Sequence, residues 1–274
     1  MLQYSELGKE TQYSFTYDPN KLFPVPRSKK RLDIAIKDNN LPFYGFDIWN
    51  HYEVSWLNSK GKPMVALAEI IYACDTPNLI ESKSMKLYFN SLNNTKFNDL
   101  TELTAIIQKD LSERVGGEVI IKIISLNDFK EDKVYRSLEG IYLDELDVEC
   151  SAYTVEPEFL TTEDFTVEET LCSDLLKSNC LVTGQPDWGS VQISYKGKKI
   201  NHANLLKYIV SFRDHIEFAE HCIERMFMDI MQRCKPSELT IYGRYTRRGG
   251  LDINPYRTTK KVNFLHVNKR LCRQ

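Results

Sequence analysis

The sequence predicts an α+β protein built from two similar modules in tandem. Apolar and polar residues alternate with a period of two over 52–56 and 65–71, which is typical of a β-hairpin. Two segments with helical spacing of their apolar residues follow, over 78–94 and 100–111. The same order of strands and helices recurs in the second half of the chain. Because sequence identity between the halves is weak, the repeat is one of architecture.

The first module is predicted to run strand, strand, helix, helix, strand, strand. A turn at 58–61 joins the two hairpin strands, and Gly116-Gly117 follows the second helix, where glycine commonly ends helices. The apolar, β-branched segment 119–126 predicts a strand, and 139–150 predicts another.

The second module repeats this order. Residues 180–200 predict two strands, or one long strand and a turn. Apolar residues with helical spacing over 202–215 and 218–234 predict two helices, the second of which ends before Pro236. Residues 239–248 predict a strand, Gly249-Gly250 a turn, and the end of the chain a last strand.

Each module must bury the apolar sides of its two helices on one face of an antiparallel sheet. Two modules side by side extend the sheet and cover edge strands. A Rossmann fold is excluded, because no G-x-G-x-x-G motif follows a strand and helices do not alternate singly with strands.

Charge is distributed unevenly along the chain, although the formal net charge is only -2. The stretch 139–174 is acidic and contains no Lys or Arg, whereas the residues from Arg244 onward are basic with one acid, Asp252. We interpret the acidic stretch as a partly extended connection between the halves. The predicted organisation is therefore an N-terminal module over 1–150, an acidic connector over 151–164 and a C-terminal module over 165–274.

Composition places the chain among soluble globular proteins. Of its 274 residues, 42% are hydrophobic and 27% are charged, and no apolar run approaches the ~18 residues of a membrane span. The polar start does not resemble a signal peptide. The seven cysteines form no C-x-x-C pair and share no zinc spacing with the five histidines. We therefore expect a cytoplasmic protein with reduced thiols, no metal and no membrane contact.

The segment 178–190 carries the strongest candidate for catalysis. It places Cys180 at or near a strand start and Asp187 seven residues later, after a turn at 184–186. A thiol acts as a nucleophile only as the thiolate, so a carboxylate returned by the turn is a candidate general base and acid. Spacing alone leaves open the alternative of a buried structural cysteine.

Two further segments are candidates for binding an anion. Residues 81–88 combine serine hydroxyls, lysines and the start of a helix, which suits a phosphate or carboxylate, although a solvated helix start has the same composition. The Arg-Arg pair before Gly249-Gly250 suits a phosphate, although it also fits an exposed hairpin tip.

Together these segments resemble the QueF family of NADPH-dependent 7-cyano-7-deazaguanine reductases. Residues Glu81-Ser82-Lys83-Ser84-Met85-Lys86-Leu87-Tyr88 match the signature E-S/L-K-S/A-h-K-L/Y-Y/F/W of that family. Ser178-Asn179-Cys180 and Gln185-Pro186-Asp187-Trp188 are similar to its catalytic loop, and Tyr245-Thr246-Arg247-Arg248-Gly249-Gly250 to its Arg-Arg-Gly-Gly turn. The resemblance covers nearly the whole chain and is closest to the long, two-module subfamily.

The resemblance implies a fold, a reaction and roles for residues. The fold is a tandem tunnelling fold (T-fold), in which each module is an antiparallel sheet with two antiparallel helices layered on one face. The reaction reduces a nitrile to an amine with two NADPH, through a thioimide on Cys180, with Asp187 transferring protons, in the biosynthesis of the tRNA base queuosine. The deazapurine-binding residues would be Glu81 and Glu220. The residues for NADPH phosphates would be Ser82, Lys83, Ser84, Arg247 and Arg248. We also expect a homodimer, and no direct binding of nucleic acid.

One position departs from the family pattern. The family has Phe-His-Glu at the start of the second helix of the C-terminal module, whereas this chain has Phe218-Ala219-Glu220. Helical spacing places Ala219 on the inward side with Ile223, and His221 roughly opposite. We interpret Ala219 as an engineered replacement of a catalytic histidine, with natural drift as the alternative. Turnover would be impaired, and the fold and thioimide formation would not.

Two other functions fit parts of the sequence. A non-catalytic T-fold module that binds purine or tRNA agrees with the basic C-terminal region and with Ala219. A sister cyclohydrolase needs Cys and His metal ligands, and the scattered histidines disfavour it.

Overall fold

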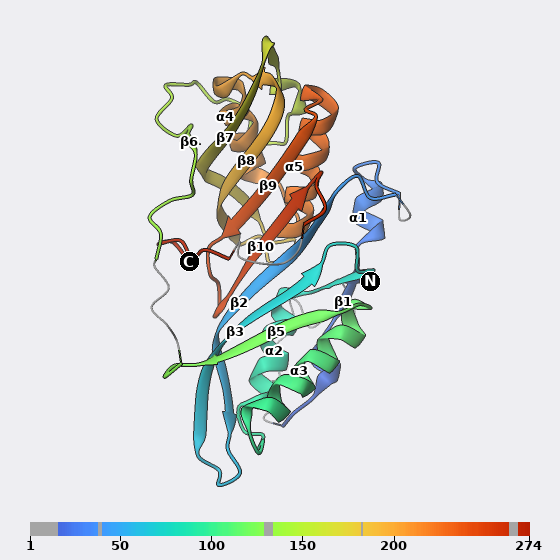
Figure 1. The fold of residues 1–274 in the computed structure, drawn as a ribbon, viewed down its shortest axis with the longest axis vertical. Helices are drawn as coiled ribbons and strands as arrows, with labels where there is room; N and C mark the ends of the chain where they lie inside the picture. The colour runs from blue at the N-terminus through green and yellow to red at the C-terminus, as the bar shows by residue number, and fades with distance from the viewer. Residues whose placement is uncertain (1–15, 38–39, 129–133, 182, 263–267) are drawn as a thin grey trace. The chain divides into compact units, whose positions relative to one another are not determined.

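The computed structural model describes residues 16–37, 40–128, 134–181, 183–262 and 268–274. These form two compact units whose segments interleave along the chain (Figure 1). Unit 1 comprises residues 1–29, 47–132 and 247–252, and unit 2 comprises 30–46, 133–246 and 253–274. The sequence predicted continuous ranges, and those boundaries stay a prediction.

Unit 1 is an antiparallel sheet with two helices. Its sheet has the order β5 (Val119–Ser125), β3 (Pro63–Ala73), β2 (Tyr44–Leu57), and the first residues of β2 belong to unit 2. The helices α2 (Ser82–Leu92) and α3 (Leu100–Val115) cover one face of this sheet (Figure 1). Beside them, β1 (Pro24–Pro26) pairs with β4 (Asn78–Ile80).

Local sequence explains where the helices of unit 1 begin and end. The Asp99 side chain accepts a hydrogen bond from the backbone N–H of Glu102 and so caps α3. At the other end Gly116 has φ of 75°, a left-handed conformation that favours glycine. Between the caps, Leu103, Ile107 and Leu111 are fully buried, as the predicted helical spacing requires.

Unit 2 repeats this arrangement with longer strands. Its sheet has the order β10 (Leu251–Thr258), β9 (Glu238–Tyr245), β8 (Pro186–Ile200), β7 (Thr162–Asn179), β6 (Ile141–Tyr142), and the first two residues of β10 belong to unit 1. The helices α4 (His202–Ser211) and α5 (Ala219–Cys234) lie along one face of the sheet (Figure 1). The 3-10 turns η3 (Pro157–Phe159) and η4 (Phe212–Asp214) complete the unit, together with the last three residues of the short helix α1 (Ser28–Leu32). The 3-10 turn η2 (Pro19–Lys21) belongs to unit 1.

The predicted fold class is confirmed, because both units are antiparallel sheets with two helices on one face. The predicted strand over 139–150 differs: only Ile141 and Tyr142 form a strand, and they pair in parallel with β7 of unit 2. This pairing spans about thirty positions of the chain, so local alternation of residues gave no indication of it.

The last third of the acidic stretch is part of a long strand. From Thr162 onward it forms β7, which runs antiparallel to the lysine-rich part of β8. Cross-strand ion pairs join Glu163 to Lys199, Asp164 to Lys198 and Glu168 to Lys196, at 3.5, 2.7 and 3.7 Å. These opposite charges remove the like-charge repulsion that would disfavour so acidic a strand by itself.

No helix in the described part of the chain is long and apolar enough to cross a membrane.

Candidate functional site

The hairpin between β7 and β8 positions Cys180 and Asp187. Ser178 lies opposite Asp187 in the ladder, and the N–H of Cys180 donates a hydrogen bond to the carbonyl of Gln185 at 2.8 Å. Gly184 has φ of 65°, which the tight return of the chain requires. Cys180 therefore comes directly after the end of β7 rather than at a strand start, because the acidic stretch before it is itself a strand. As predicted, the turn brings Asp187 back beside the end of β7.

The segment before α5 is hydrogen-bonded to the end of β7. The N–H of Asn179 donates to the carbonyl of His215 at 2.8 Å, and the N–H of Glu217 donates to the carbonyl of Asn179 at 3.1 Å. Ala219 is the first residue of α5 and is 9% exposed, and Glu220 follows with 1% exposed. Residues Cys180, Asp187, Ala219 and Glu220, predicted from separate segments, thus belong to one neighbourhood of unit 2.

Buried charges hold the start of α5. Glu217 forms an ion pair with Lys30 at 3.1 Å, and its carboxylate lies 3.6 Å from Nδ1 of His221. Burial by itself raises the pKa of the Glu217 carboxyl, but His221 and Lys30 outweigh it and lower that pKa to about 2. His221, expected roughly opposite the inward side, is only 3% exposed, and its ring packs edge-on against Phe218.

Glu224, one helical turn after Glu220 on α5, forms buried ion pairs with two arginines. The guanidinium of Arg31 donates two hydrogen bonds to the carboxylate of Glu224, at 2.9 and 2.7 Å, and Arg257 donates two more, at 3.1 and 2.9 Å. Burial opposes ionisation of Glu224, but Arg257 and Arg31 together lower its pKa well below the usual range. No local motif marks these residues, because the partners lie far apart in the chain.

In unit 1, the signature segment 81–88 forms the start of α2. The carboxylate of Glu81 caps this helix by accepting hydrogen bonds from the N–H groups of Lys83 and Ser84, both at 2.7 Å. The Ser84 hydroxyl donates to the carbonyl of Glu81 at 2.7 Å and accepts from the N–H of Phe23 at 3.0 Å. Burial raises the pKa of Glu81. The carboxylate therefore has a structural role in addition to the one predicted for it.

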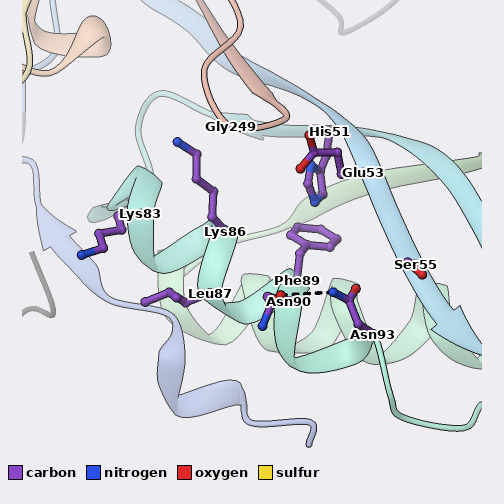
Figure 2. A pocket seen from close by; sticks show the side chains of 10 residues that line it. All are labelled: His51, Glu53, Ser55, Lys83, Lys86, Leu87, Phe89, Asn90, Asn93 and Gly249. Carbon is purple, nitrogen blue, oxygen red and sulfur yellow. Dashed lines mark hydrogen bonds between the residues drawn. The ribbon is translucent and has the colours of Figure 1, made fainter. Parts of the chain in front are cut away.

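A cavity of about 450 Å³ lies beside this helix (Figure 2). Lys83 and Lys86 line it, together with the turn residue Gly249. The remaining lining residues are His51, Glu53, Ser55, Leu87, Phe89, Asn90 and Asn93. Two lysines and two amides around one cavity suit a ligand with phosphate and hydroxyl groups. Ser82 and Ser84 do not line this cavity.

The Arg-Arg-Gly-Gly turn closes over the same helix. Gly249 and Gly250 have φ of 55° and 75°, and a Cβ at Gly249 would lie 2.9 Å from Nζ of Lys86. The guanidinium of Arg247 stacks over the ring of Tyr52, 4.2 Å from its centroid. Lys86 of the signature segment therefore lies beside the turn after Arg248, and Lys83 lines the same cavity as Gly249.

His51 forms a hydrogen bond to the backbone of this turn. Its Nδ1 lies 2.9 Å from the carbonyl oxygen of Gly250, so that nitrogen carries the proton and donates. Burial lowers the pKa of His51 to about 4, and Lys86 contributes, so the imidazole is neutral at pH 7.

Comparison with known proteins agrees with these motifs. The family profile described as "Nitrile reductase, 7-cyano-7-deazaguanine-reductase N-term" matches residues 13–123, and the profile "QueF-like protein" matches residues 186–263. A curated protein of Legionella pneumophila (strain Lens) is 60% identical over 270 residues, which cover 98% of this chain and 95% of that protein. The chain belongs to the QueF family.

Relatives from other genera agree with this assignment. Proteins of Acidovorax ebreus and Cupriavidus necator are 54% and 53% identical over 280 and 275 residues, and each match covers 99% of both chains. All three relatives carry the name NADPH-dependent 7-cyano-7-deazaguanine reductase.

The QueF motifs fall on the two neighbourhoods described above. The signature and the Arg-Arg-Gly-Gly turn are in unit 1, whereas the Cys–Asp hairpin and α5 are in unit 2. In the described part of the chain, no group of three or more His, Cys, Asp and Glu residues is arranged to hold a metal ion.

Proposed function

We propose that this chain reduces 7-cyano-7-deazaguanine to 7-aminomethyl-7-deazaguanine with NADPH, as the names of its relatives indicate. The observation that carries the proposal is the hairpin that holds Cys180 and Asp187 next to the start of α5. A nitrile accepts hydride poorly, and addition of a thiol converts it into a better acceptor.

The residues of unit 2 would act as follows. Asp187 takes the thiol proton of Cys180 and passes it to the nitrile nitrogen while the sulfur bonds to the nitrile carbon, which gives a thioimide. NADPH, when bound, supplies one hydride to this carbon and a second one after the thiol has left, so two equivalents are consumed. At each reduction Asp187 transfers one proton from solvent to nitrogen, and between the reductions the sulfur leaves as the thiol with a proton from nitrogen, which restores Cys180.

Two carboxylates are proposed to bind the deazapurine. Glu220 is 1% exposed and lies in the first turn of α5, where the helix dipole stabilises its charge. A buried carboxylate suits the adjacent N–H donors on a guanine-like edge, since it accepts two parallel hydrogen bonds. Glu81 is the second proposed contact, and its cap of α2 fixes the direction of its carboxylate.

NADPH is proposed to bind at the start of α2 and the turn after Arg248. Lys83 and Gly249 line the cavity in Figure 2. Arg247 comes two residues before Gly249 and stacks over Tyr52. Cationic side chains and helix N–H groups are the usual ligands of nucleotide phosphates. Ser82, Ser84 and Arg248 are proposed as further contacts.

Ala219 is proposed to slow turnover, because it offers no proton donor where the family has a histidine. We further propose that the protein works in the cytoplasm as a homodimer and contacts no nucleic acid directly.

An intact-mass measurement tests the proposed function. Mixing the protein with 7-cyano-7-deazaguanine should add the mass of one nitrile, and Cys180→Ala should abolish the adduct. Cys272→Ala is the matched control, because Cys272 is exposed and lies outside the proposed site. A protein that binds tRNA in a salt-sensitive manner but forms no adduct would instead be a non-catalytic binding module.

A further inference from the structure

Ser178 and Tyr245 share one face of the sheet of unit 2 with Asp187. Ser178 lies opposite Asp187 between β7 and β8, and Gly189 lies opposite Tyr245 between β8 and β9. Side chains alternate along a strand, so Asp187 and Gly189 are on the same face. The diagonal from Asp187 to Tyr245 is a distance that a tyrosine ring can reach.

This face lies under α5. A Cβ at Gly243 would lie 2.8 Å from Ile223 of α5 and 3.3 Å from the ring of Tyr245. A Cβ at Gly189 would lie 3.3 Å from the same ring. The two glycines therefore leave the space that the Tyr245 ring occupies between the sheet and the helix.

The hydroxyls on this face are buried and unsatisfied. Ser178 is 0% exposed and Tyr245 is 4% exposed. Within the described residues, neither Oγ of Ser178 nor Oη of Tyr245 has a hydrogen-bond partner. The thiol of Cys222 lies near both hydroxyls, and the two hydroxyls lie near each other, but none of these contacts has the geometry of a hydrogen bond.

The charge of Asp187 reaches the same buried space. Burial raises the pKa of the Cys222 thiol to about 12, and Glu217 and Asp187 contribute through their charge. Burial also raises the pKa of Tyr245 far above its usual value, with further contributions from Cys222 and Asp187. Both groups stay protonated at neutral pH, so Tyr245 is a hydrogen-bond donor next to a carboxylate.

Buried hydroxyls are nearly always satisfied, so two unsatisfied ones beside a proposed proton-transfer residue need an explanation. Hydrogen bonds of catalytic groups are often poorly aligned without ligand and tighten in the substrate complex. We propose that Ser178 and Tyr245 are positioning residues that donate hydrogen bonds to Asp187 when the nitrile is bound. This inference rests on the proposed function and deepens it.

The expected effect has a defined sign. Donors to a carboxylate favour its charged form and lower its pKa, so their removal raises the pKa of Asp187. The charged and titratable side chains on the neighbouring elements include Cys180 and Lys177 at the end of β7, and Glu220, His221 and Cys222 on α5. Arg213, His215 and Glu217 lie in the segment before α5. Tyr245→Phe and Ser178→Ala leave these other charges in place.

The test measures the rate of adduct formation with 7-cyano-7-deazaguanine against pH for the wild type, Tyr245→Phe and Ser178→Ala. We expect the plateau rate to fall about tenfold and the pH midpoint to rise by about one unit, as for one lost charge-assisted hydrogen bond. Tyr242→Phe is the matched control, because its hydroxyl is on the opposite face and accepts from Arg244. It should leave the midpoint unchanged.

The outcomes separate this inference from the proposed function. If the wild type forms the adduct and both variants keep its rate and midpoint, the inference is wrong and the proposed function stands. If the wild type forms no adduct, both are wrong. Ser178→Ala gives the answer by itself if Tyr245→Phe does not fold.

Discussion

The N–H of Glu217 donates a hydrogen bond to the carbonyl oxygen of Asn179 at 3.1 Å. Asn179 immediately precedes Cys180, and Glu217 comes two residues before Ala219. This hydrogen bond therefore joins the end of β7, next to Cys180, to the segment that leads into α5. The ion pair between Glu217 and Lys30 adds to this attachment. The geometry of the candidate site depends on this attachment as much as on the hairpin that carries Cys180.

Ala219→His should accelerate turnover. A positioned proton donor contributes about 10²–10⁴-fold to such reactions, and Ala219 is where the family has one. Single-turnover oxidation of NADPH, followed by absorbance, should become faster in the variant by an amount in this range, with adduct formation retained. Ala219→Gln is the control for side-chain volume and should stay slow. Equal rates for wild type and Ala219→His would refute the role of this position.

Glu220→Gln should weaken binding of the deazapurine nitrile. The amide has one acceptor oxygen in place of two and lacks the charge, so hydrogen bonds to the ligand are lost or weakened. We expect the dissociation constant, measured by calorimetry on the Cys180→Ala background, to rise about 10- to 100-fold. The melting temperature shows whether the variant is folded. An unchanged affinity in a folded variant would exclude Glu220 from the binding site.

Lys83→Ala should raise the KM for NADPH with little effect on adduct formation. Lys83 lines the cavity of unit 1, and loss of one charge-assisted contact to a phosphate corresponds to about a tenfold change. Lys109→Ala is the control, because Lys109 is an exposed lysine on α3. If both variants have the wild-type KM, NADPH does not contact Lys83.

Glu217 should make stability depend on pH in the acid range. Its pKa in the folded state is lowered to about 2, whereas the ordinary value is 4.5, so its stabilising effect is complete above about pH 4.5 and is lost as the pH falls towards 2. Such a shift corresponds to about 3 kcal/mol. Urea unfolding of wild type and Glu217→Gln should differ by about this amount at pH 7.

The difference between wild type and Glu217→Gln should shrink as the pH falls from 4.5 to 2. A constant difference across this range would show that the lost stability comes from packing, not from the ionised carboxylate. Glu163→Gln provides the comparison, because its ion pair with Lys199 is partly exposed and should contribute no more than about 1 kcal/mol.

The sequence alone determined the class of fold and the residues of the motifs. Periodicity predicted α2, α3, α4 and α5, because each must bury one apolar side on a sheet, and the turns at Gly184 and Gly249-Gly250 followed from residues that tolerate positive φ. The turn between Cys180 and Asp187 was predictable for the same reason, but the strand before Cys180 was not, because its acidic residues were interpreted as a connection.

Only the tertiary structure decided how the acidic stretch and the start of α5 are used. Asp164 and Glu168 are in a strand because lysines some thirty residues later neutralise them across the sheet. Glu224 is buried because Arg31, which is 193 positions away, and Arg257 satisfy its charge. The space under α5 for the Tyr245 ring likewise depends on glycines of two different strands. These contacts join segments that are far apart in the sequence, so no local pattern of residues predicts them.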